Sequence, residues 1–95
     1  MQLRLSRTAQ KREADLLATT ARAIATADHF TTTLWHDRRY HSVDHPTLEA
    51  ARAFIPGMMA QFPDSYRRPM IYAVLNGRAE LIPDRFQGGM NAPSL

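Results

Sequence analysis

Residues 69–83 read Pro-Met-Ile-Tyr-Ala-Val-Leu-Asn-Gly-Arg-Ala-Glu-Leu-Ile-Pro, and they give the clearest structural signal in the chain. Asn76 and Gly77 lie between two apolar runs, where this dipeptide favours a type I′ hairpin turn because both central residues need a positive φ. Such a turn pairs Leu75 with Arg78. The stretch therefore predicts a β-hairpin over residues 69–83.

The two faces of this hairpin differ in composition. One is uniformly apolar, so we expect it to form the core; it carries Met70, Tyr72, Val74, Ala79 and Leu81. The other mixes apolar and charged side chains, namely Ile71, Ala73, Leu75, Arg78, Glu80 and Ile82. Because this second face is too apolar to meet only water, we expect it to lie under the first helix or in a dimer interface.

Another hairpin is predicted earlier in the chain, over residues 30–45. Its two arms are rich in β-branched and aromatic residues, and a polar turn that begins at Asp37 separates them. With a two-residue loop, alternation divides the side chains between two faces. One face then carries Phe30, Leu34, His36, His41 and Val43. The other carries Thr31, Thr33, Trp35, Tyr40, Ser42 and Asp44.

Two helices complete the predicted domain. Apolar residues recur at helical spacing over residues 8–28, where Ser6 or Thr8 can cap the first turn. A second helix is predicted over residues 47–62, with Thr47 as its cap and a kink or a break at Pro56-Gly57. The expected fold is α+β in the order α-ββ-α-ββ, with two helices packed on a four-stranded antiparallel sheet of two hairpins.

Size and composition exclude several classes of protein. Ninety-five residues form one domain, 1–95, and a flexible tail is expected over 84–95. The apolar fraction is 44%, with no run near the roughly 20 residues that span a bilayer. No apolar stretch resembles a secretory signal, so we expect a cytoplasmic protein. The sequence contains no cysteine, which excludes disulfides and thiolate metal sites. It also contains no phosphate-binding loop, so it implies no cofactor.

Positive charge gathers at the beginning of the chain. The net charge is +3, and residues 1–12 contribute +4 through Arg4, Arg7, Lys11 and Arg12. Residues 13–95 hold eight arginines against nine acidic residues, which sums to −1. A clustered basic arm, here residues 1–7 and the start of the first helix, is typical of contact with phosphate backbones, although such charges are also often merely solvated.

The first hairpin also gathers the residues that could support catalysis. His36, His41 and His45 are expected on one side, where three imidazoles could hold a divalent metal. As a second alternative, His36 and His41 could serve as acid and base in a metal-free nuclease, with Arg38, Arg39 and Tyr40 beside them. The histidine spacing matches no recognised zinc pattern, and no carboxylate dyad is evident. We therefore favour a non-enzymatic protein.

The opposite side of the same hairpin suggests a binding surface. Trp35 and Tyr40 are expected to be cross-strand neighbours beside Arg38 and Arg39, and exposed aromatics near guanidinium groups suit base stacking or protein recognition. Trp35 could instead pack under the first helix. We expect a small binding module for a macromolecule, with nucleic acid favoured over protein. The alternative is a protein-interaction or inhibitory homodimer module that uses Ile71, Leu75 and Ile82.

Overall fold

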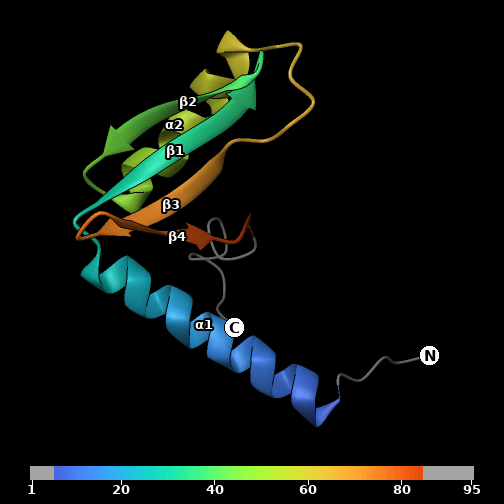
Figure 1. Cartoon of the computed structure of the whole chain (residues 1–95), viewed down its shortest axis with the longest axis vertical. Helices are drawn as coiled ribbons and strands as arrows, with labels where there is room; N and C mark the ends of the chain where they lie inside the picture. Colours follow the sequence, from blue (N-terminus) through green and yellow to red (C-terminus); the bar gives the residue numbers. More distant parts are fainter. Residues whose placement is uncertain (1–5, 85–95) are drawn as a thin grey trace.

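The computed structural model describes residues 6–84, which form two helices and one four-stranded sheet (Figure 1). The elements are α1 (Arg7–Thr26), β1 (His29–His36), β2 (Arg39–His45), α2 (Leu48–Gln61), β3 (Met70–Leu75) and β4 (Arg78–Ile82). All neighbouring strands are antiparallel, in the order β2-β1-β3-β4. The predicted α+β fold and its α-ββ-α-ββ order are confirmed.

Both hairpins close on two-residue turns in which the central residues have positive φ. Asn76 and Gly77 have φ values of 51° and 79°, and Asp37 and Arg38 have values of 56° and 67°. Leu75 pairs with Arg78 as the Asn-Gly signal predicted. In the first hairpin His36 pairs with Arg39, so the two-residue loop and the division of side chains between two faces are also confirmed.

The core lies between one face of the sheet and both helices. Ile71 and Ile82 are opposed on β3 and β4, and both are 0% exposed. They share a buried cluster with Phe30 and Ala73 of the sheet and with Leu48, Ala51 and Ile55 of α2. The end of α1 packs against the same cluster through Ala23, Ile24 and Ala27. Burial of these apolar side chains is the main stabilising contribution to the fold.

The core face of the second hairpin is the opposite of the predicted one. Ile71, Ala73 and Ile82 are buried, whereas the face expected to be core has the exposed Leu81 and the half-buried Tyr72. The reason is the pairing of β3 with the central strand β1, which aligns Phe30 with Ala73 and so puts Phe30 and Ile71 on one side. This second face lies under the helices, which was one of its two predicted alternatives; of the three residues of the predicted dimer interface, Ile71 and Ile82 lie inside the domain and Leu75 is exposed.

The long helix α1 packs only by its C-terminal part. Ser6 caps it by accepting a hydrogen bond from the Ala9 backbone N–H at 3.0 Å, and Thr20 is its one buried residue. The preceding turns run past the sheet (Figure 1), so the expectation that this helix lies along a sheet face holds for its last two turns alone. Arg4 and the predicted tail beyond Asp84 lie outside the described residues.

The second helix covers the sheet over β1 and β2. Thr47 caps it as predicted, through a 3.0 Å bond from the Ala50 N–H to Oγ1. Pro56 stands inside one continuous helix, so the alternative of two short helices is wrong; Pro56 and Gly57 are both exposed. Within residues 6–84, neither helix has the length and apolarity required to cross a membrane.

Candidate functional site

One face of the sheet has no helix over it in the part of the chain that the structure describes. Both helices pack on the side of Phe30 and Ile71, and alternation sends the intervening side chains to the other side. We call this second side the open face. On β1 and β2 it carries His29, Thr31, Thr33, Trp35, Tyr40, Ser42 and Asp44, and on β3 and β4 it carries Met70, Tyr72, Val74, Ala79 and Leu81.

An exposed aromatic pair occupies the turn end of the open face. Trp35 and Tyr40 are opposed across β1 and β2, with ring centroids 4.7 Å apart at an interplanar angle of 66°. Trp35 is 36% exposed and Tyr40 is 61% exposed. The edge-to-face contact stabilises the hairpin by roughly 0.5–1.5 kcal/mol and still leaves both rings accessible. Trp35 does not pack under α1, which lies against the opposite face.

Two exposed arginines lie at the tip of the hairpin; Arg38 is next to the aromatic pair, whereas Arg39 is opposed to His36 and so belongs to the other face. Arg38 is in the turn and Arg39 is the first residue of β2, and both are exposed. Arg38 adopts the left-handed backbone region with φ 67°, which L residues other than asparagine and aspartate rarely enter. Neither guanidinium forms an ion pair with another residue in the 6–84 range. Both are available to a ligand that carries negative charge.

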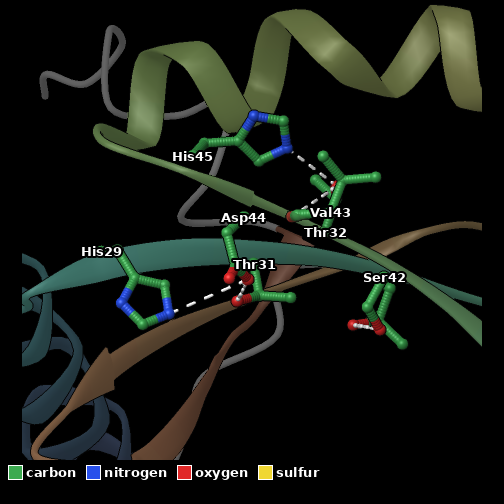
Figure 2. Close-up of polar contacts among 8 residues, drawn as sticks. His29, Thr31, Thr32, Ser42, Val43, Asp44 and His45 are labelled. Carbon is green, nitrogen blue, oxygen red and sulfur yellow. Dashed lines mark hydrogen bonds and ion pairs between the residues drawn. The ribbon is translucent and has the colours of Figure 1, made fainter.

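Polar side chains continue the open face away from the aromatic pair (Figure 2). The hydroxyls of Thr33 and Ser42 are 3.2 Å apart, and the Thr31 hydroxyl donates to Asp44 Oδ1 at 2.7 Å. His29 Nε2 lies 3.8 Å from the same carboxylate oxygen. The face of β1 and β2 thus passes from aromatic to hydroxyl to carboxylate chemistry along the hairpin.

The opposite face of the hairpin holds His45 in the interior. Its Nε2 donates to the Thr32 hydroxyl at 3.0 Å, because that hydroxyl in turn donates to the Val43 carbonyl at 3.4 Å (Figure 2). The His45 ring also packs on Phe54, with centroids 5.0 Å apart. Buried polar groups need such partners, so His45 has a structural role here.

The other two histidines of the proposed metal set lie at the tip of the hairpin. His36 Nε2 donates to Asp64 at 3.1 Å, and His41 Nε2 donates to the His36 carbonyl at 3.1 Å. Both rings pack on Phe62. The three histidines do not converge, and no group of three metal-ligating side chains occurs among residues 6–84.

The residues of the predicted metal-free nuclease site lie on two different faces of the hairpin, because side chains alternate along each strand. His36 and His41 point toward α2, whereas Tyr40 lies on the open face. Acid, base and charge-stabilising groups must surround one reacting atom, and this arrangement does not bring them together. Sequence reasoning also missed Asp64 as the partner of His36, since nothing local connects two residues 28 positions apart.

The basic segment of α1 is distant from the aromatic pair. Arg7, Lys11 and Arg12 are exposed on the first turns of the helix. Figure 1 shows the turn of the first hairpin and the beginning of α1 at opposite ends of the long axis, along which the molecule extends 41 Å. The two parts of the predicted binding surface are therefore separate.

Comparison with protein-family models, curated proteins and solved structures found no match for this chain. The function is therefore argued from the site alone.

Proposed function

We propose that this protein is a non-enzymatic module that binds single-stranded nucleic acid on the open face. The observation that carries the proposal is the exposed Trp35 and Tyr40 pair on a sheet surface that no described helix covers. Unpaired bases stack on aromatic side chains with about 1–3 kcal/mol per base. RNA-recognition modules use aromatics on an open four-stranded sheet in the same way, which is an analogy of surface and not of family.

Electrostatics supports the same ligand. Arg38 lies in the turn next to the aromatic pair and can contact a phosphate beside a stacked base, whereas Arg39 is opposed to His36 and adds positive charge at the tip from the other face. The basic residues Arg4, Arg7, Lys11 and Arg12 lie elsewhere along the chain and add to a net charge of +3, which attracts polyanions over a distance. Single strands are preferred over duplexes because paired bases cannot reach the rings. The proposal includes a cytoplasmic location, where single-stranded RNA is present.

A protein partner or second copy is the other candidate, and it has a different surface from the one that the sequence suggested. With Ile71 and Ile82 buried, the available apolar area lies on the β3 and β4 half of the open face, around Tyr72, Val74 and the exposed Leu81. Mass measurement by light scattering tests this candidate. A dimer that Leu81→Lys dissociates would support it.

The fluorescence of Trp35 tests the nucleic-acid proposal, because Trp35 is the only tryptophan in the chain. Single-stranded RNA, single-stranded DNA and duplex DNA are titrated at two salt concentrations. We expect single strands to quench the emission and to bind more weakly at high salt, since binding releases counterions. Emission that no nucleic acid alters would overturn the proposal.

Fluorescence anisotropy of labelled oligonucleotides measures the affinity of variants that lack the tryptophan and of a matched control variant. Trp35→Ala is expected to weaken single-strand binding roughly 10-fold to 100-fold, the equivalent of one lost stacking contact. Tyr66→Ala removes an aromatic ring that is also exposed but lies in the connection between α2 and β3. This control variant should bind like the original protein.

A further inference from the structure

The open face of the first hairpin carries three cross-strand rows that differ in chemistry. Successive rows are two residues apart on each strand, or about 6.6 Å. In order from the turn they are Trp35 with Tyr40, Thr33 with Ser42, and Thr31 with Asp44. A nucleic-acid strand that stacks a base on the first row and follows the hairpin therefore brings a later base to the third row.

The carboxylate of Asp44 is accessible and held in place. Its Oδ1 accepts the Thr31 hydroxyl at 2.7 Å, and His29 Nε2 lies 3.8 Å from the same atom (Figure 2). The side chain is nevertheless 72% exposed. Among the interactions of residues 6–84, none ends on Oδ2. The threonine thus restrains the carboxylate while its second oxygen remains available to a ligand.

A carboxylate accepts hydrogen bonds and repels phosphate, so Asp44 suits a base edge and not the backbone. Guanine offers two adjacent N–H donors on its Watson–Crick edge, whereas adenine, cytosine and uracil each offer a donor beside an acceptor. We infer that Asp44 selects guanine at a position beyond the stacked base; this inference rests on the proposed function. The two carboxylate oxygens would accept from N1–H and N2–H as a bidentate pair.

The other two rows do not compete with this selection. Stacking on Trp35 and Tyr40 accepts every base, because each base has an aromatic face. Thr33 is buried at 9% exposure and bonds to Ser42, whose exposed hydroxyl both donates and accepts and so adapts to any base edge. Base preference is therefore concentrated at Asp44.

Short uracil oligonucleotides that carry one guanine, adenine or cytosine at successive positions test the inference, in both ribose and deoxyribose forms. We expect the oligonucleotide with guanine at one position to bind about tenfold more tightly than the all-uracil strand, as a bidentate contact provides. Asp44→Asn keeps an acceptor for Thr31 but presents one donor and one acceptor, which match adenine, cytosine and uracil alike and no longer match the two donors of guanine. This variant should lose the guanine preference.

Two further variants distinguish recognition of the base by Asp44 from a general effect of charge and from the restraint that Thr31 places on the carboxylate. Asp15→Asn removes one negative charge on the exposed part of α1 and should leave the base preference unchanged. Thr31→Val releases the carboxylate without removing it, so it should weaken the guanine preference without reversing it. Equal binding of all bases, or a guanine preference that survives in Asp44→Asn, would overturn the inference and leave the proposed function standing. If no oligonucleotide binds, both fail.

Discussion

The two hairpins share one design and differ in what they bury and expose. Each closes on a two-residue turn with positive φ, yet β3–β4 uses Asn76 and Gly77 while β1–β2 uses Asp37 and Arg38. The second hairpin contributes Ile71 and Ile82, both 0% exposed, to the core. In the first hairpin burial is concentrated on the central strand β1, which includes Phe30 and Leu34, whereas on the edge strand β2 His45 is the only buried residue.

This difference indicates a division of roles within one sheet. An Asn-Gly turn tolerates positive φ at little cost, whereas Arg38 holds the same conformation with a β-carbon that opposes it. Backbone strain of this kind persists where the surrounding structure holds it, and it is frequent at functional sites. Both hairpins contribute to the core, the first through Phe30 and Leu34 and the second through Ile71 and Ile82, but the first also presents the candidate site. Substitutions in the core, in the buried hydrogen bond between β1 and β2 and in the two turns test this division of roles.

The largest expected effect is in the core of the second hairpin. Ile71→Ala should lower the free energy of unfolding by about 2–5 kcal/mol, because it removes apolar contacts and leaves a cavity. Val74→Ala on the opposite face of the same strand should cost less, since Val74 is half-buried. Urea denaturation measures both losses. A loss for Val74→Ala as large as that for Ile71→Ala would contradict the assignment of the two faces.

A smaller effect is expected from the buried hydrogen bond between the hairpin strands. Thr32→Val keeps the shape of the side chain but leaves His45 Nε2 without its acceptor, which should cost about 1–3 kcal/mol of unfolding free energy. Thr31→Val deletes a hydroxyl on the open face, where water can replace it, so its cost should be lower. Thermal and urea denaturation of the two variants provide the comparison. Equal losses would show that His45 does not depend on Thr32.

The smallest effects concern the two turns, and they should have opposite signs. Gly77→Ala places a β-carbon at φ 79°, where it meets no atom within 4 Å, so its cost of about 1 kcal/mol is conformational alone. Arg38→Gly relieves the corresponding strain and should stabilise the domain by up to about 1 kcal/mol, while it weakens oligonucleotide binding. Denaturation and anisotropy measure the two consequences. If Arg38→Gly lowers the free energy of unfolding instead, the backbone of Arg38 is not strained in this turn.

The parts of the fold that the sequence predicted are those that depend on local chemistry. Asn76-Gly77 specified a turn, and Ser6 and Thr47 specified helix starts, because each acts on backbone groups within three residues. The core face of the second hairpin was predicted wrongly. Alternation shows that two faces exist, but the pairing of β3 with β1 and the packing of both helices decide which one is covered.

The candidate site was predictable in part for the same reason. Trp35 and Tyr40 are neighbours across a short turn, so their contact followed from the loop length. The separation of the basic helix start from this pair depends on where α1 docks, and the partnership of His36 with Asp64 depends on the path of the chain after α2. Neither relation is encoded in a local pattern.

For this protein, the amino-acid sequence by itself determined the order of elements, the Asn76-Gly77 turn type and, given a two-residue loop in the first hairpin, the residues that share each face of a hairpin. These features follow from backbone conformational preferences and from the two-residue period of a strand. Only the tertiary structure decided that both helices lie on one side of the sheet, which buries Ile71 and Ile82 and leaves Trp35, Tyr40 and Asp44 accessible. That choice depends on long-range burial of apolar surface, which no short segment can specify.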